Sequence, residues 1–216
     1  MPYKRITDWE EGSEGSFLSK IRGIFDRKAP LRERIALCIY RLRNQKAKIA
    51  TLAARMEQRD REFFSKCVVA QMAKDSVRAS MYANECAEVR KMARLTLLCE
   101  FALEQIILRL ETVEEFGDVP AITGPVAGVV QVIRSQVQGI MPQVSFELGM
   151  IGETLNGIAL EVGEVSTPGY DISASSEHAQ RILTEASAIA EQRMRERFPQ
   201  LPPVAVPTRS REQAMA

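Results

Sequence analysis

Apolar side chains recur along residues 31–63 at alternating steps of four and three. This spacing is a heptad repeat, which is typical of a helix packed lengthwise against another helix. The repeat continues for more than four heptads, and two of its positions, Gln45 and Arg59, are polar. Its apolar positions are Leu31, Ile35, Cys38, Leu42, Ile49, Leu52, Met56 and Phe63.

A second heptad repeat follows, at Val89, Met92, Thr96, Cys99, Leu103, Ile106, Leu110 and Val113. The 86 residues between Pro30 and Gly117 contain no glycine or proline, the two residues that most often end helices. Polar residues 74–76 interrupt the repeats, and Asp75 can cap a helix that begins after it. We therefore predict a helical hairpin over residues 30–117 with its tip near residues 72–76. One unbroken helix of roughly 130 Å is the alternative.

Shorter apolar runs replace the long repeats after residue 117, where Pro120, Gly124, Pro125 and Gly128 break the rod. Residues 126–140 and 144–160 are predicted helices, separated by Met141-Pro142. Each interior glycine costs a helix about 0.5–1 kcal/mol relative to alanine, so we expect these helices to be less stable than the hairpin and able to rearrange.

The predicted fold is therefore all-α: a long antiparallel helical hairpin, then short helices over residues 118–163, then a C-terminal amphipathic helix. We assign residues 164–176 to a linker, 177–198 to the C-terminal helix and 199–216 to a proline-rich tail. One side of the C-terminal helix is apolar and is expected to be its buried face: Ile182, Leu183, Ala186, Ile189, Ala190 and Met194.

Charge divides the chain although the net charge is only +1. Residues 1–110 hold 22 Lys and Arg against 14 Asp and Glu, whereas residues 111–216 hold 7 against 14. The most basic part runs from Lys20 to Arg61. A basic hairpin can attract the acidic second half or an anionic surface. A solvated helix face with its own counter-charges is the alternative.

Candidate chemistry is sparse. The four cysteines, Cys38, Cys67, Cys86 and Cys99, lie at helical positions without metal-ligand spacing, which predicts buried reduced thiols. The single histidine, His178, is expected to be a solvated or capping residue. No phosphate-binding loop or zinc-protease motif occurs. We expect no catalytic residue, no metal, no cofactor and no enzyme activity.

The N-terminal segment, residues 1–29, carries acidic residues where a signal peptide has its apolar core, so we expect a cytoplasmic protein. Later in the segment, an amphipathic helix is a candidate membrane-binding element: apolar side chains share one face and basic ones surround it. Packing of the same face against the hairpin base is the equally favoured alternative. The residues are Phe17, Leu18, Lys20, Ile21, Arg22, Ile24, Phe25, Arg27 and Lys28.

Several segments in order resemble the archaeal ESCRT-III-like cell-division proteins of the CdvB family, within the Snf7-like superfamily. Residues 61–92, particularly 74–85 (KDSVRASMYANE) and 88–92 (EVRKM), resemble the hairpin-tip region of that family, and residues 102–112 (ALEQIILRLET) resemble the end of its second helix. Met141-Pro142, Glu147-Leu148 and Leu155-Asn156 resemble its third and fourth helices. The resemblance covers about residues 28–204.

The resemblance implies a subunit that polymerises, with itself or with paralogues, into filaments that constrict membranes in cell division or vesicle release. The C-terminal helix would fold back on the hairpin and restrain it, and the opposite charges of the two halves can supply that restraint. The protein would lie on the inner face of the cell membrane, at the division site. Some members carry a C-terminal winged-helix segment; this chain ends at Ala216, so recruitment by that route is not expected.

The tail resembles the family's MIT-interacting motif, through which a AAA-type ATPase engages and remodels the filament. Leu201 and Val204 would fill apolar pockets of the MIT domain, while Pro202 and Pro203 hold the segment extended. A simple terminal linker is the alternative.

Two other function classes are kept beside the filament subunit. One is a passive coiled-coil adaptor or scaffold, which would not assemble on anionic vesicles. The other is a nucleic-acid-binding rod, which is not expected because few aromatic residues interleave with the basic ones.

Overall fold

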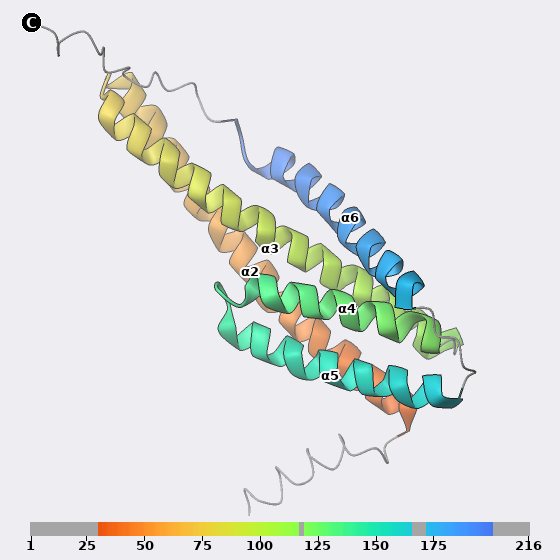
Figure 1. Cartoon of the computed structure of the whole chain (residues 1–216). Coiled ribbons are helices and arrows are strands. Elements are labelled where there is room, and N and C mark those ends of the chain that lie inside the picture. Colours follow the sequence, from red (N-terminus) through yellow and green to blue (C-terminus); the bar gives the residue numbers. More distant parts are fainter. Residues whose placement is uncertain (1–29, 117–118, 166–171, 201–216) are drawn as a thin grey trace, which may run out of the picture.

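The computed structural model describes residues 30–116, 119–165 and 172–200. Within them the chain forms only helices: α2 (Leu31–Met72), α3 (Ser76–Phe116), α4 (Val119–Val137), α5 (Pro142–Val165) and α6 (Ile172–Arg197). Helices α2 and α3 lie antiparallel along their whole length, and α4 and α5 pack beside the base half of this pair (Figure 1). Helix α6 runs along α3 and also contacts α4. The all-α hairpin fold predicted from the sequence is confirmed, and the unbroken rod is wrong.

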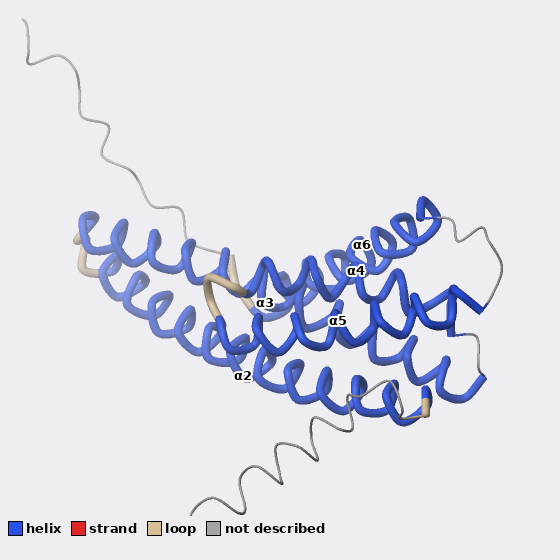
Figure 2. The backbone as a smooth tube through the Cα atoms, turned by 60° about the horizontal axis from the view of Figure 1, so that its bottom comes forward, coloured by secondary structure: helices blue, strands red, loops and turns tan. Residues whose placement is uncertain are grey.

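The hairpin tip follows the capping chemistry expected from the sequence. Helix α2 ends in a Schellman motif, in which the N–H of Lys74 donates to the Gln71 carbonyl and the N–H of Asp75 to the Ala70 carbonyl, both at 2.9 Å. Lys74 takes the left-handed conformation that this motif requires, with φ of 59°. The Asp75 carboxylate then accepts the N–H of Arg78 at 3.0 Å, which caps α3 as predicted. Only three residues separate the helices (Figure 2).

The predicted heptad repeat of α2 holds as far as Ile49 and only in part beyond it: Met56 is buried as predicted, whereas Ala53 and Asp60 are buried one residue after the predicted Leu52 and Arg59. Arg59, predicted to lie in the seam, is exposed. In α3 a similar difference occurs at Met92, which is 39% exposed while its neighbour Ala93 is buried. The cause is helix geometry, because an undistorted helix of 3.6 residues per turn drifts out of a strict seven-residue repeat.

The largest buried cluster lies where four helices meet at the base of the hairpin. Leu42 and Ile49 of α2 and Leu103 and Ile106 of α3 are fully buried there. Helices α4 and α5 supply much of the rest: Val126, Val129, Val130, Ile133, Leu148, Ile151, Leu155 and Ile158. The tip half of the hairpin lacks this second layer (Figures 1 and 2). The base is therefore the thick, stable part of the molecule.

Helix α4 begins earlier than the sequence indicated. It starts at Val119 and contains Pro125, whereas the proline and glycine residues of this region were expected to break the rod. A proline inside a helix removes one backbone hydrogen bond, a cost that tertiary packing can offset. Helix α5 begins at Pro142, the first-turn position that proline favours.

The glycines of α5 permit a close helix contact. A Cβ atom at Gly149 would lie 3.0 Å from the Arg134 guanidinium carbon of α4. Gly152 faces Val130 of the same helix, and the Ser145 hydroxyl donates to the Arg134 carbonyl at 3.1 Å. These contacts hold α5 against α4 at this point.

Candidate functional site

The contact of α6 with the hairpin, which we call the α6 contact, is mainly apolar. Its apolar residues on α6 are Ile182, Ala186, Ala190 and Met194, followed by Phe198 just beyond the helix, all less than 9% exposed. Ile182 and Ala186 join the large base cluster. The remaining three form a second cluster with Ala53, Met56, Val89, Ala93 and Leu97 of the hairpin. Of the predicted buried face, only Ile189 is exposed.

Two ion pairs flank the α6 contact. Arg94 of α3 pairs with Glu191 at 2.7 Å, and Arg197 pairs with Glu57 of α2 at 3.4 Å. In the second pair the acid lies on the hairpin and the base on α6, which is the reverse of the expected arrangement. Helix α6 itself holds four arginines and four glutamates. Both pairs are partly exposed, and such pairs contribute about 0–1 kcal/mol each. Apolar burial, rather than attraction between two charged halves, therefore holds α6.

A buried ion pair of the hairpin, between Asp60 and Arg90, lies beneath the end of α6. The Asp60 carboxylate, fully buried, accepts two hydrogen bonds from the Arg90 guanidinium, at 2.6 and 2.9 Å. The ring of Phe198 lies 5.9 Å from the same guanidinium, so the C-terminal end of α6 covers this pair. Asp60 was not among the predicted residues, because the strict heptad repeat passes through Arg59 instead. A repeat counted through Ala53, Met56 and Asp60 would have placed Asp60 on the buried side of α2.

The base of the hairpin is tied to α5 and to itself by further ion pairs. Arg34, which is buried, pairs with Glu161 of α5 at 2.5 Å. Across the hairpin, Arg43 pairs with Glu111 at 2.6 Å and Lys46 with Glu104 at 3.1 Å. These contacts join the basic first half to acidic residues of the second half and of α3.

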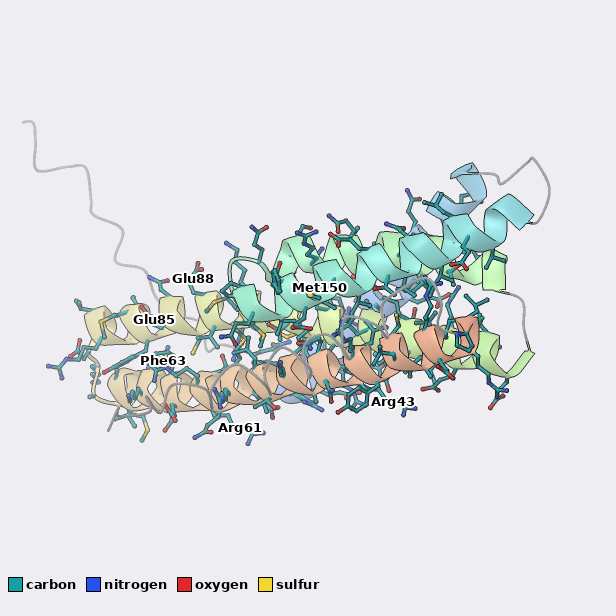
Figure 3. All side chains as sticks on the ribbon, turned by 90° about the horizontal axis from the view of Figure 1, so that it is seen from below. Arg43, Arg61, Phe63, Glu85, Glu88 and Met150 are labelled. Carbon is teal, nitrogen blue, oxygen red and sulfur yellow. The ribbon has the colours of Figure 1, made fainter. Side chains whose placement is uncertain are left out.

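Basic side chains are also exposed along the hairpin. Arg43 and Arg61 project from α2 on the side away from α4 and α5, whereas Glu85 and Glu88 project from α3 (Figure 3). Lys48 and Arg55 are exposed on α2 as well. Arg43 is paired with Glu111 and Arg61 with Glu57. Lys48 and Arg55 are therefore the side chains of this group through which the α2 side can present positive charge to an anionic surface.

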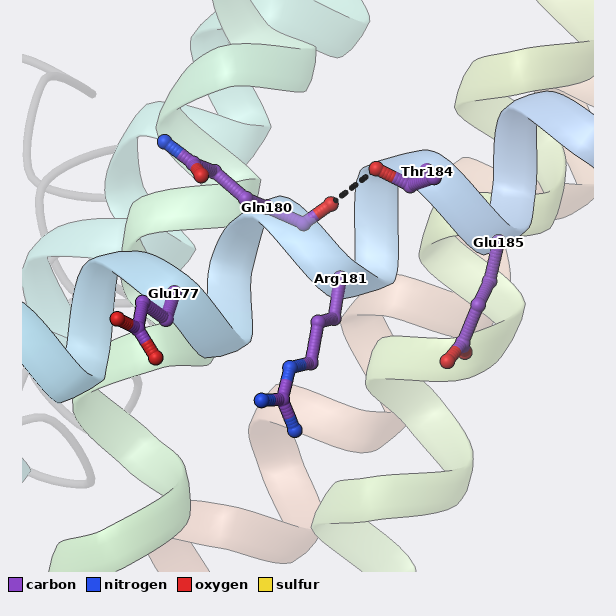
Figure 4. Close-up of a pocket in the computed structure, with 5 residues that line it drawn as sticks. All are labelled: Glu177, Gln180, Arg181, Thr184 and Glu185. Atoms are coloured by element: carbon purple, nitrogen blue, oxygen red, sulfur yellow. Dashed lines mark hydrogen bonds between the residues drawn. The ribbon is translucent and has the colours of Figure 1, made fainter.

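The outward face of α6 is polar. Figure 4 shows Glu177, Gln180, Arg181, Thr184 and Glu185 around a surface hollow, all from this one helix. The Thr184 hydroxyl donates to the Gln180 carbonyl at 2.8 Å, a bond within the helix. Nothing in this set resembles a catalytic constellation. His178 is exposed at the same end of the helix.

The four cysteines are buried and form no disulfide. Burial raises the pKa of Cys38 to about 11 and that of Cys99 to about 12. Burial, with the nearby Asp60, raises the pKa of Cys86 to about 11. These three thiols are thus protonated and unreactive at neutral pH, as the sequence predicted.

Within the described residues, no cluster of three or more potential ligand side chains could hold a metal ion. Nor does any described helix have the length and apolar character needed to cross a bilayer. The predicted membrane-binding residues (17–28) and the predicted MIT-binding residues (201–204) lie outside the described part of the chain.

Two cell-division proteins are similar in sequence to this chain. The Cell division protein B1 of Sulfolobus acidocaldarius is 45% identical to the chain over 175 residues, which are 81% of this chain and 82% of that protein. The Cell division protein B of the same organism is 32% identical over 192 residues, 88% of this chain and 74% of that protein. No family model matches the chain, and no solved structure matches it. With this identity and coverage, the chain belongs to the CdvB family of cell-division proteins.

Proposed function

We propose that the protein is a filament-forming, ESCRT-III-like subunit that assembles on anionic membranes during cell division and is restrained by its own α6. The observation that carries the proposal is the 45% identity to Cell division protein B1 on a chain that forms a long helical hairpin. These relatives support a role in cell division. We extend this role to polymerisation, membrane constriction and remodelling by an ATPase.

The α6 contact supports the proposed restraint. Helix α6 covers one flank of α3, so that flank is not available to a neighbouring subunit while α6 is bound. The chain leading into α6 from α5 spans residues 166–171, and α6 makes no large contact with α5. Release of α6 would expose the Arg90 side of the hairpin and leave the four-helix base cluster mostly intact.

Assembly would be with copies of the same chain or with paralogues. The exposed arginines and lysines of α2 would face the membrane or a neighbouring subunit. A AAA-type ATPase would engage residues 201–204 through its MIT domain and extract subunits. The subunit itself would perform no chemistry and need no cofactor.

The test is electron microscopy of the protein with anionic vesicles and with uncharged vesicles, in full-length form and truncated after Val165. The cut preserves α4 and α5, because their removal would expose the base cluster. We expect filaments on anionic vesicles, and at lower concentration for the truncated protein. A protein that remains dispersed in both forms on anionic vesicles would be a passive coiled-coil adaptor instead.

A further inference from the structure

On the outward face of α5, three large apolar side chains remain at least partly exposed in the described structure. Phe146, Met150 and Leu160 are 67%, 37% and 68% exposed. At about 100° per residue they fall within one sector of about 80°, and at about 1.5 Å per residue the stripe is roughly 21 Å long. We call these three residues the α5 stripe. Figure 3 shows Met150 on the helix.

The stripe is not needed for packing within the described fold. The opposite face of α5 already buries Leu148, Ile151, Leu155 and Ile158 in the base cluster. A ridge of large apolar side chains that adds nothing to the core usually marks a contact with something else.

The charge on and beside the stripe is acidic, and Glu153 lies within the same sector, between Met150 and Leu160. Helix α5 contains four glutamates and neither lysine nor arginine. Glu153 is exposed and Glu147 is half-buried, and neither forms an ion pair with another described residue. Glu161 is paired with Arg34. An occupant with an apolar face and basic flanks would complement this surface.

We propose that the occupant is the N-terminal segment of the same chain: residues 17–25 pack along the α5 stripe when the protein is not on a membrane. The segment has the matching chemistry, with an apolar face composed of Phe17, Leu18, Ile21, Ile24 and Phe25. Its basic residues are Lys20, Arg22, Arg27 and Lys28, with one acid, Asp26, among them.

The chain length permits this docking. The Arg34–Glu161 contact places the first turn of α2 beside the last turns of α5, next to Leu160. The five residues 26–30 can span up to about 17 Å when extended, enough for the chain to turn back along α5. As a helix, residues 17–25 extend for about 12 Å, which fits within the length of the stripe.

This inference rests on the proposed membrane function for its consequence. The apolar face that would enter a membrane interface is the face that packs on α5, so the two sites compete for one segment. A docked segment cannot bind a membrane, so the apparent membrane affinity is the intrinsic affinity multiplied by the fraction of molecules whose segment is released. Membrane binding would therefore release the α5 stripe at the same moment as it anchors the chain.

The docking is tested with the full chain in dilute solution, without vesicles. The single tryptophan, Trp9, is replaced and a reporter is placed on the apolar face, in the variant Trp9→Phe with Phe17→Trp. We expect a blue-shifted emission that acrylamide quenches weakly. Phe146→Asp with Leu160→Asp should shift the emission to that of solvated tryptophan. Leu108→Asp is the matched control, because Leu108 is 57% exposed on α3.

Solvent-like emission before any change in α5, or emission unaffected by the α5 substitutions, would overturn the proposal. A change in sedimentation with Phe146→Asp would overturn it too, because the stripe would then bind a second copy. The vesicle measurement is separate: Phe146→Asp with Leu160→Asp should strengthen binding to anionic vesicles at least about threefold, by removing the competitor. A chain that docks the reporter but never binds vesicles would refute the membrane function and leave the docking standing.

Discussion

The α6 contact should open without unfolding the hairpin when two of its apolar side chains are shortened. The perturbation is Ile182→Ala with Met194→Ala; both residues are buried against the hairpin or α4, and each loses three heavy atoms. At about 0.8 kcal/mol per buried methylene, the two changes weaken the contact by about 5 kcal/mol. Alanine is the best helix former, so helix propensity does not explain the loss.

The assay is hydrogen exchange, followed by mass spectrometry, of backbone amides in residues 177–197. Since 1.4 kcal/mol is tenfold, exchange in α6 should accelerate by about three orders of magnitude. Amides of residues 35–49 in α2 should keep their protection, because the base cluster retains the packing of α4 and α5. The matched control is Thr184→Ala on the polar outer face, where no apolar contact is lost.

Two results would refute this reasoning. If α6 and the base of α2 accelerate together, α6 is part of one cooperative unit and cannot act as a separate restraint. If α6 exchange responds more to 0.5 M salt than to the double substitution, charge rather than apolar burial holds the helix. The two ion pairs, at up to about 1 kcal/mol each, should together contribute less than about thirtyfold.

Three further results are expected. Asp60→Ala should lower the free energy of unfolding by about 3–5 kcal/mol, because it leaves the mostly buried Arg90 charge unpaired. Urea denaturation measures this loss. The double variant Asp60→Leu with Arg90→Met should recover much of it. Burial raises the pKa of Glu100 above its ordinary 4.5, so the folded protein holds that proton more tightly and this group's contribution to stability falls as pH rises. Glu100→Gln should therefore raise the melting temperature at neutral pH. Equal melting temperatures of the two proteins there would contradict the prediction. In the tail, Leu201→Asp with Val204→Asp should weaken binding of tail peptides to the MIT domain of the cognate ATPase at least about a hundredfold. Two buried apolar side chains, at about 1.5–3 kcal/mol each, would be lost. Unchanged binding in a titration would show that residues 201–204 are only a linker.

The hairpin was predictable because its signals are local and repeated. A long run without glycine or proline, two heptad repeats and an aspartate at the cap position all indicate the same turn, and the structure places the turn there. The buried face of the C-terminal helix was predictable for the same reason, through Ile182, Ala186 and Ala190.

The predictions failed at positions where tertiary packing, rather than the local sequence, determines the structure. Asp60 is buried because Arg90, thirty residues later, lies opposite it, and no local pattern shows that partner. Pro125 lies inside α4 because burial of the helix offsets the lost hydrogen bond, whereas local rules end the helix there. The balance of charge within α6 was visible in the sequence, but the net charge of each half concealed it.

The central claim is that α6 leaves the hairpin when the protein assembles on a membrane. Its most direct test is a spin-label distance between Glu88→Cys on α3 and Gln192→Cys on α6, both exposed positions, in a chain whose native cysteines are all buried. We predict one short distance in dilute solution and a new, longer and broader distribution on anionic vesicles under conditions that give filaments. Filaments on vesicles that keep the short distance would contradict the claim.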